Sequence, residues 1–489
     1  MSLIKKLAGE TVIYGMSHML SKILFFIVLT PYLTYKLDTN TVEYGIYSEL
    51  YSYSTILLTI LIFRLDTALF RYGTGGNIGK ALGTGLVPIL GIVSVALIIS
   101  WLYGQEIATA LGYPQSAHYV RWFAYIICLD ALAALIYAKL RLESRPYRFM
   151  LYKVGNVILT VSIIVLCFDI LPSLNPTWLA DMRIKLGMMR MVDYVFFANL
   201  VASAVTLLAM LGQFLSAKLT FDGQLLKKML TYAGPLVLVG IAGSINQTFS
   251  TPIQKYFLGG AVMSNLADAG IYAAAAKLAI ILNLFTTAFN YAAEPFFFNN
   301  ANRKDATEVY GTVALMYTLV ACLVTLGIVA YLDVVVLIIG EQYRAGANIV
   351  PYLLFAYILL GLYYNVSIWY KLKDKTHLGA IISIIGMIVT ITISIMLLPM
   401  IGTVASAYAA LACYAVMVTI CYILGRKYYP IDYPVGRILG YLAATAILCI
   451  FANITKEQLP PLAYYPAITA VIAAAAITIW RLDVRKAIS

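Results

Sequence analysis

Six charged residues lie within long apolar stretches of this sequence, where a charge is unusual. A charged side chain at the centre of a bilayer costs at least about 2.5 kcal/mol, so it usually faces protein or water rather than lipid. Cations in a solvated cavity can bind phosphate, and a buried carboxyl group can carry a proton or exchange a coupling ion. The six residues are therefore candidates for anion binding or ion coupling: Lys22, Arg64, Lys277, Asp66, Asp130 and Glu294.

The first apolar stretch carries a polar stripe. Glu10, Tyr14, His18 and Lys22 are spaced by four residues and so share one slowly drifting face of a helix. Lys22 lies deepest in the apolar stretch. Two interpretations stay open for Lys22 and His18: binding of a substrate phosphate, or hydrogen bonds and a local ion pair between helices.

The second apolar stretch contains Arg64 and Asp66. On a continuous helix these side chains are about 200° apart, so they cannot pair with each other. Arg64 lies near the expected cytoplasmic end, where a long side chain can extend to the lipid headgroups, and this interpretation is favoured over substrate binding. Asp66 shares a face with Tyr44, Tyr51, Thr55 and Thr59.

Two further polar faces occur in the second half of the chain. Gln247 lies at helical spacing with Gly240, Ser244 and Thr251, which favours close helix packing slightly over a substrate pathway. Asn290 shares a face with Asn283, Thr287 and Glu294, whereas Lys277 lies roughly opposite. The two faces of this last helix therefore cannot line the same cavity.

Asp130 is the most isolated carboxyl group in the chain. Desolvation favours the protonated form of such a group, which suits proton coupling. A buried acid that is hydrogen-bonded to a neighbouring helix is an equally good explanation.

The elements that must position these residues are membrane-spanning helices. Of the 489 residues, 62% are hydrophobic and only 11% are charged, which argues against a soluble protein. Apolar runs of about 20 residues are long enough to cross the hydrocarbon core. Fourteen such runs are predicted, centred near Leu24, Leu57, Ser94, Leu132, Val161, Ala202, Gly240, Ile281, Leu319, Leu359, Val389, Ala412, Ala444 and Val471.

The net charge of +12 fits this topology. Lys and Arg are concentrated in the loops on the side of the N-terminus, so we expect both termini to be cytoplasmic and the protein to lie in a bacterial inner membrane. This topology explains the excess of basic residues, so no nucleic-acid partner is predicted. The six cysteines fall in apolar segments without metal-ligand spacing, so neither a metal site nor a disulfide framework is predicted.

An internal repeat divides the chain. Thr30-Pro31-x-x-x-Tyr35 recurs as Thr251-Pro252-x-x-x-Tyr256, and Gly45-Ile46-Tyr47 recurs as Gly270-Ile271-Tyr272, in the same order. We therefore predict two six-helix bundles, residues 1–218 and 219–428, followed by two further helices and a cytoplasmic tail in residues 429–489. Because six is an even number, the halves should be related by a pseudo-two-fold axis along the membrane normal, with a cavity between them.

Several motifs resemble polysaccharide biosynthesis proteins of the Wzx flippase type. They include Glu43-Tyr44-Gly45-Ile46-Tyr47, the run Leu65 to Tyr72, Ala293-Glu294-Pro295-Phe296, and Tyr343-Arg344 followed by Ile349-Val350-Pro351. These flippases belong to the multidrug/oligosaccharidyl-lipid/polysaccharide (MOP) exporter superfamily. The resemblance implies a V-shaped pair of bundles and alternating access that moves a polyprenyl-pyrophosphate-linked oligosaccharide across the inner membrane.

The same resemblance implies a set of partners and roles. The transported repeat unit would serve an O-antigen of lipopolysaccharide, a capsule or an exopolysaccharide, and a polysaccharide polymerase or chain-length regulator is an expected partner beside membrane lipids. Lys22, Arg64 and Lys277 would hold the pyrophosphate, and a proton or sodium ion, rather than a cofactor, would supply energy.

Three alternatives remain. A multidrug exporter of the MATE type has the same fold, and a lipid II flippase is a close relative. A membrane polysaccharide polymerase would be an enzyme, and it needs catalytic acids on a sizeable loop or domain outside the membrane. No stretch between the apolar runs exceeds about 25 residues, so we expect a transporter.

Overall fold

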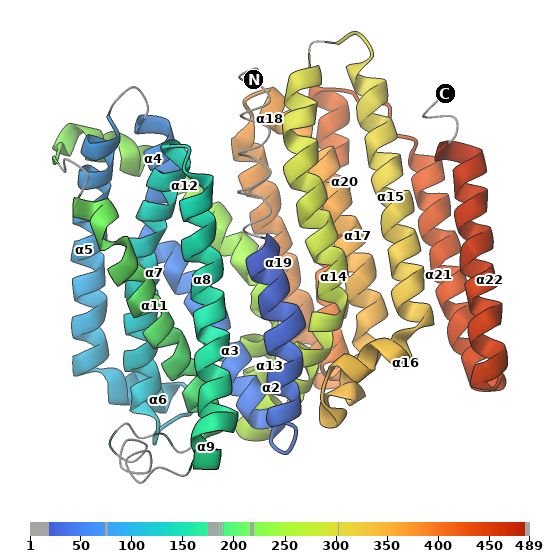
Figure 1. Cartoon of the computed structure of the whole chain (residues 1–489). Coiled ribbons are helices and arrows are strands. Elements are labelled where there is room, and N and C mark those ends of the chain that lie inside the picture. The colour runs from blue at the N-terminus through green and yellow to red at the C-terminus, as the bar shows by residue number, and fades with distance from the viewer. Residues whose placement is uncertain are drawn as a thin grey trace. The chain divides into compact units, whose positions relative to one another are not determined.

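The computed structural model describes residues 19–73, 77–174, 185, 188, 190–215, 220–301 and 303–484, and the described residues form helices without strands (Figure 1). An apolar chain in hydrocarbon must satisfy its backbone hydrogen bonds internally, and a helix does so within each segment. His18, with the polar stripe that precedes it, lies outside the described residues.

Fourteen of these helical segments are long and apolar enough to cross a membrane, which confirms the predicted number and the all-helical class. The chain is a multi-pass membrane protein. The segments are Met19–Lys36, Thr41–Tyr72, Ile78–Leu102, Ala117–Leu142, Pro146–Leu174, Met191–Leu215, Gly223–Thr248, Val262–Phe298, Ala306–Ala330, Glu341–Leu372, Thr376–Ile401, Val404–Tyr428, Val435–Gln458 and Pro461–Asp483.

The chain forms two compact units. The first comprises Met1–Tyr256 and Gly260–Gly270, and the second comprises Phe257–Gly259 and Ile271–Ser489. The predicted bundle boundary at residues 218 and 219 stays a prediction.

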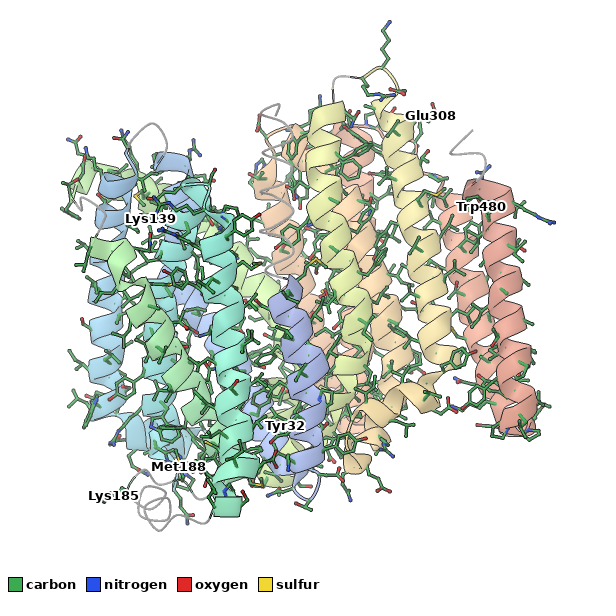
Figure 2. The ribbon with its side chains drawn as sticks, viewed as in Figure 1. Tyr32, Lys139, Lys185, Met188, Glu308 and Trp480 are labelled. Carbon is green, nitrogen blue, oxygen red and sulfur yellow. The ribbon has the colours of Figure 1, made fainter. Side chains whose placement is uncertain are left out.

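The first unit contains the helices that position most of the candidate residues. They are η1 (Phe25–Leu29), α2 (Thr30–Lys36), α3 (Thr41–Ile62), α4 (Leu65–Tyr72), α5 (Ile78–Leu102), α6 (Gly104–Ala110), α7 (Ala117–Leu142), α8 (Pro146–Val165), η2 (Leu166–Ile170), α9 (Leu171–Leu174), α11 (Met191–Leu215), α12 (Gly223–Thr248) and α13 (Ser250–Phe257). Figure 2 shows Lys139 at one end of this unit and Tyr32 at the other. Both take part in polar contacts: Lys139 donates to the carbonyl of Gln213, at 2.7 Å, and Tyr32 donates to Asp169, at 2.6 Å.

The second unit includes most of α14 (Val262–Asn300). The first residues of this helix, up to Gly270, belong to the first unit. The core of the second unit surrounds Trp369, whose indole nitrogen donates to the carbonyl of Cys421 at 3.0 Å. The other helices of this unit are α15 (Ala306–Ala330), α16 (Leu332–Val335), η3 (Val336–Ile338), η4 (Glu341–Ile349), α17 (Val350–Val366), α18 (Ile368–Leu372), α19 (Thr376–Ile401), α20 (Val404–Tyr428), α21 (Val435–Gln458), α22 (Pro461–Ile479) and η5 (Trp480–Val484).

The two last membrane helices pack on α15 (Figure 1). Near one end Tyr465 donates to Asp333 at 2.6 Å, and Lys456 pairs with the same carboxylate at 3.2 Å. Near the other end of α21, Arg437 pairs with Asp483 at 3.0 Å. These polar contacts therefore join the tail helices to each other and to Asp333 of α16.

The repeated Thr-Pro motifs occupy equivalent helix interruptions. Thr30 and Pro31 begin α2 directly after the π-helical turn η1, and Thr251 and Pro252 lie in α13, just after α12 ends beside Phe249. Proline has no backbone N–H and cannot donate a helical hydrogen bond. Each Thr-Pro motif therefore lies where the regular series of helical hydrogen bonds is interrupted.

The second apolar stretch is not one continuous helix. Phe63 and Arg64 have φ angles of 50° and 53°, and these two left-handed residues separate α3 from α4. Such a conformation is uncommon for residues other than glycine. The angle of about 200° between Arg64 and Asp66, which assumed an unbroken helix, is therefore wrong.

Candidate functional site

A hydrogen-bonded network links three helices inside the first unit. Ser203 of α11 donates to a carboxylate oxygen of Asp130, on α7, at 2.9 Å. Ser203 also lies 3.3 Å from the amide oxygen of Asn199, and the amide nitrogen of Asn199 donates to the hydroxyl of Tyr51, on α3. Asn199 and Ser203 are four residues apart and so project from the same face of α11. Asp130 lies near the middle of α7, so the network is at membrane depth.

Two lysines complete this network. Lys153 of α8 interacts electrostatically with Asp130, and its ammonium group lies 5.1 Å from the centre of the Tyr137 ring. Lys22 interacts electrostatically with Lys153 and is half-buried. Lys153, which was not among the predicted residues, thus interacts electrostatically with both Lys22 and Asp130, which were. We call Lys22, Asp130, Lys153, Asn199 and Ser203 the Asp130 network.

The local fold explains why Lys153 reaches this depth. Helix α8 begins with Pro146, whose fixed φ angle and missing N–H suit a first helical position. Lys153 follows seven residues later, which places it roughly 10 Å along the helix at a rise of about 1.5 Å per residue. It belongs to the span Pro146–Leu174, although it is not among the six charged residues that were predicted to lie within apolar stretches.

Arg64 lies elsewhere in the first unit, against α12. A Cβ atom added to Gly240 would be 2.7 Å from Nη2 and 2.9 Å from Nε of Arg64, and 2.8 Å from Cγ2 of Thr59. The guanidinium group therefore packs on the bare backbone of Gly240. Within the part of the chain that the structure describes, Nε of Arg64 is buried and has no hydrogen-bond partner. This placement differs from simple extension toward the lipid headgroups.

The other predicted residues of the first unit are more peripheral. Asp66 is half-buried, and the hydroxyl of Thr67 lies 3.5 Å from its carboxylate, at the limit for a hydrogen bond. Gln247 is exposed near the end of α12. Neither joins the Asp130 network.

Three predicted residues belong to α14 of the second unit. Glu294 forms an ion pair with Lys371 of α18, at 2.8 Å, so its charge is already matched by a neighbour. Lys277 and Asn290 are both half-buried. A common cavity for these residues and those of the first unit stays a prediction.

A buried ion pair lies outside the set of predicted residues. The ammonium group of Lys255, on α13, lies 2.8 and 2.9 Å from the two carboxylate oxygens of Glu49, on α3. It also donates to the carbonyl of Leu111 at 2.5 Å and lies 4.1 Å from the centre of the Tyr113 ring. Both charged side chains are fully buried. Glu49 interrupts an apolar run, and that signal was available in the sequence.

No group of three or more His, Cys, Asp or Glu side chains that could hold a metal occurs among the described residues. The six cysteines are free and buried. The Asp130 network offers cations, a carboxylate and hydrogen-bonding groups, which suit binding of an anion and exchange of a proton.

The architecture matches solved structures of membrane transporters. A lipid II flippase, MurJ, in an inward closed conformation superposes with a TM-score of 0.69 over 96% of this chain and 99% of its own, at 14% sequence identity. An inward-facing multidrug resistance MATE family transporter of the MOP superfamily has a TM-score of 0.61 over 88% of this chain and 96% of its own, at 13% identity. The chain has the fold of the MOP exporters.

This fold is shared with a MOP superfamily transporter from Pyrococcus furiosus that is described as having a binding pocket of reverse polarity. Its TM-score is 0.58, its identity is 14%, and the match covers 86% of this chain and 95% of that one. No protein-family model and no curated protein sequence matches the chain. At these identities the MOP likeness establishes the fold alone.

Proposed function

We propose that this protein is a flippase of the Wzx type, which moves a polyprenyl-pyrophosphate-linked oligosaccharide across the bacterial inner membrane by alternating access. The observation that supports it best is the pair of half-buried lysines, Lys22 and Lys153, whose charges interact within membrane-spanning helices. Two neighbouring cations at this depth repel each other, and an anion between them removes the repulsion. A pyrophosphate group carries enough negative charge to do so.

The arrangement addresses the main physical obstacle to lipid flipping. Moving a charged headgroup through hydrocarbon without compensation is prohibitively costly. Lysines and hydrogen-bonding groups at membrane depth replace part of the water that the headgroup loses. In this proposal Lys22 and Lys153 bind the pyrophosphate. Arg64 and Lys277 contact the pyrophosphate at other steps of its translocation.

Asp130 supplies a way to couple transport to an ion gradient. While its carboxylate is charged it offsets the charge of Lys153, and protonation releases Lys153 to bind an anion. We propose a proton as the coupling ion. Asp66 and Glu294 are weaker candidates, and Glu294 already pairs with Lys371.

The test is polysaccharide assembly in a strain that lacks its own flippase. Lys22→Ala and Lys153→Ala should abolish surface polymer while the protein is inserted in the membrane at the wild-type level. Lys228, which is exposed near the start of α12, provides the control, and Lys228→Ala should retain assembly. Wild-type polymer from both network variants at equal protein levels would remove the proposed anion site.

Export of organic cations is the second candidate, because MATE transporters share the fold. An isolated acid such as Asp130 could attract a cation. This alternative predicts that expression raises drug resistance and that Lys153→Ala leaves the resistance intact. The flippase proposal predicts no resistance and full dependence on Lys153.

A further inference from the structure

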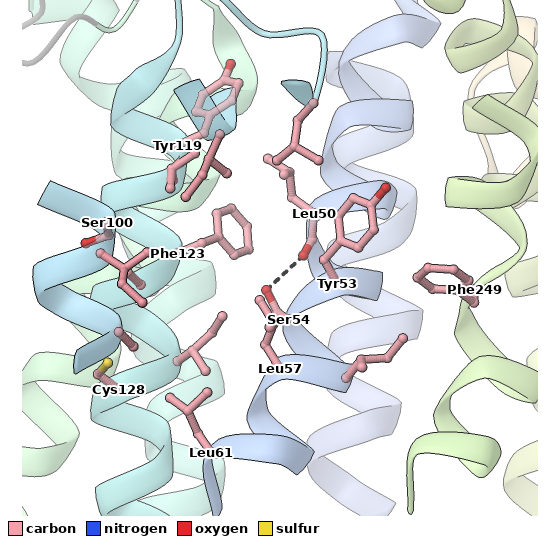
Figure 3. Close-up of a pocket in the computed structure, with 18 residues that line it drawn as sticks. Leu50, Tyr53, Ser54, Leu57, Leu61, Ser100, Tyr119, Phe123, Cys128 and Phe249 are labelled. Atoms are coloured by element: carbon pink, nitrogen blue, oxygen red, sulfur yellow. Dashed lines mark hydrogen bonds between the residues drawn. The ribbon is translucent and has the colours of Figure 1, made fainter. Parts of the chain in front are cut away.

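An apolar pocket of about 540 Å³ lies inside the first unit (Figure 3). Its walls come from α3, α5, α6 and α7, and Phe249 closes one side. The volume is within the range of about 300–1,000 Å³ that is typical of sites for small organic ligands. Most of the lining is aliphatic or aromatic, as shown by Leu50, Leu57, Ile99, Phe123, Ile127 and Phe249.

Three of the four hydroxyl groups in the lining, those of Tyr53, Ser54 and Ser100, already have polar partners, and the fourth belongs to Tyr119. Ser54 donates to the carbonyl of Leu50 at 2.8 Å, as Figure 3 shows, and Ser100 donates to the carbonyl of Leu97 at 2.8 Å. The hydroxyl of Tyr53 interacts with the carboxylate of Glu49. A polar headgroup would gain few hydrogen bonds here, because each of these three groups already has a polar partner. A hydrocarbon chain that enters the pocket has no hydrogen bonds to lose.

The pocket is accessible from outside the unit. Leu57 on α3 and Ile99 on α5 both line the pocket, yet their exposed fractions are 45% and 44%. Both residues belong to membrane-spanning helices. The part of the pocket that these two side chains line is therefore at a depth where flexible hydrocarbon chains are available.

The pocket and the Asp130 network share a wall. Phe123 lines the pocket, and its ring contacts the ring of Tyr51 edge to face, with the centroids 5.5 Å apart. Tyr51 is in turn bonded to Asn199 of the network. On α7, Cys128 lines the pocket and Asp130 belongs to the network, because residues two apart lie on nearly opposite faces of a helix.

We propose that this pocket binds the isoprenoid chain of the lipid-linked substrate while the Asp130 network holds its pyrophosphate. The inference rests on the proposed function and adds the location of the lipid tail. A phospholipid keeps its phosphate at the membrane surface, whereas a polyprenyl lipid bound at the network has its phosphate near the middle of α7. Only the second molecule brings a chain and a phosphate to adjoining sites at the same depth.

The test uses the full-length protein in nanodiscs made of phosphatidylethanolamine and phosphatidylglycerol. A polyprenyl phosphate with a photoreactive diazirine in its chain should label peptides of α3 and α7, and excess unlabelled polyprenyl phosphate should remove at least nine-tenths of this labelling. Ala124→Phe, which fills the pocket, should reduce labelling at least tenfold. Ala443→Phe, on an exposed face of α21, is the control and should label as the wild type does.

Three outcomes would overturn the proposal. Labelling could fall outside the pocket, it could persist unchanged in a folded Ala124→Phe variant, or a diazirine phospholipid could label the pocket without competition from polyprenyl phosphate. The competition experiment needs only the wild-type protein, so it decides the matter even if Ala124→Phe does not fold. Labelling of the pocket by the polyprenyl probe, in a protein that does not support polymer assembly, would reject the proposed function and leave the chain site standing.

Discussion

Gly45 and Gly270, which occupy equivalent positions in the two repeats, lie against each other where α3 and α14 cross. A Cβ atom on Gly270 would be 2.8 Å from the backbone nitrogen of Gly45 and 2.4 Å from the carbonyl oxygen of Thr41. A Cβ atom on Gly45 would be 2.1 Å from the carbonyl oxygen of Leu266. These obstacles are backbone atoms, which cannot move aside as a side chain can.

We therefore expect Gly45→Ala and Gly270→Ala to destabilise the protein by about 3 kcal/mol each, the upper part of the range for overpacking. Thermal unfolding in detergent measures the effect. Gly155 of α8 is the matched control, since a Cβ atom there meets nothing within 4 Å, and Gly155→Ala should be neutral or stabilising. Equal melting temperatures for all three variants would contradict the close crossing.

The buried pair of Glu49 and Lys255 should be sensitive to the loss of either partner. Glu49→Gln leaves the ammonium group of Lys255 buried without a counter-ion, and such losses cost about 3–5 kcal/mol. The double variant Glu49→Gln with Lys255→Met should recover part of that loss, because no buried charge then remains. Melting temperatures and size-exclusion profiles provide the measurement.

An exposed ion pair supplies the comparison. Arg303 and Asp305 approach to 2.7 Å, with exposed fractions of 57% and 46%. Asp305→Asn should leave the melting temperature unchanged, since water already solvates both groups. If Glu49→Gln and Asp305→Asn change the melting temperature equally, burial does not explain the contribution of Glu49 to stability.

Gly240 should matter through Arg64. A methyl group at position 240 would displace the guanidinium group that packs there, so Gly240→Ala should impair transport to a similar extent as Arg64→Ala. In an Arg64→Ala background Gly240→Ala should have a smaller further effect, because only the close approach to Thr59 then remains, and the difference corresponds to a coupling energy of about 0.5–3 kcal/mol. Additive losses in a double-mutant cycle would show that Gly240 acts independently of Arg64.

The carboxylate of Asp130 should control the proton dependence of transport. In liposomes with an imposed pH gradient, Asp130→Asn should remove the dependence of transport on that gradient. Ser203→Ala, which removes only the 2.9 Å hydrogen bond, should shift the dependence and not abolish it. A gradient response that is unchanged in Asp130→Asn would exclude this residue as the coupling site.

Asp222 should make stability depend on pH at the acidic extreme. The hydrogen bond from Lys80, helped by backbone N–H groups of Leu225 and Gln224 at the start of α12, lowers the pKa of Asp222 to about 2 from an ordinary value of 3.8. Because the charged form is favoured in the folded state, this stabilisation is complete above about pH 4 and disappears as the pH falls toward 2.

Asp222→Ala should consequently lower the melting temperature at neutral pH and lower it much less near pH 2. Lys80→Gln, which removes the 2.6 Å ion pair but keeps the helix cap, should reproduce part of this change. A difference between wild type and Asp222→Ala that is the same at both pH values would show that the carboxylate charge is irrelevant.

The spans were predictable because membrane helices depend on apolar composition over about 20 residues, a property that is local in sequence. The interruption at Phe63 and Arg64 was not, since neither residue is a glycine or proline and nothing local demands a left-handed conformation. Arg64, one of the two residues of this interruption, packs on Gly240 of α12. The environment of the interruption therefore depends on a helix that is far away in the sequence.

The candidate site was predictable only in part. Lys22 and Asp130 were identified because each interrupts an apolar run, but their proximity to Lys153 depends on how α7 and α8 pack. Lys153 lies early in its helix, so a reading along the chain assigns it to the preceding loop. Lys255 likewise belongs to a short helix, and only the fold brings it to Glu49.

The position of the Glu49–Lys255 pair has a consequence for the history of the duplicated chain. By the offsets of the repeated motifs, Lys255 corresponds to Thr34 and Glu49 to Ala274, so the equivalent positions carry no second charged pair. Two identical halves would contain either two such pairs or none. The gain or loss of a pair therefore belongs to the divergence of the halves, and either route passes through a lone buried charge unless both partners change together, which is costly.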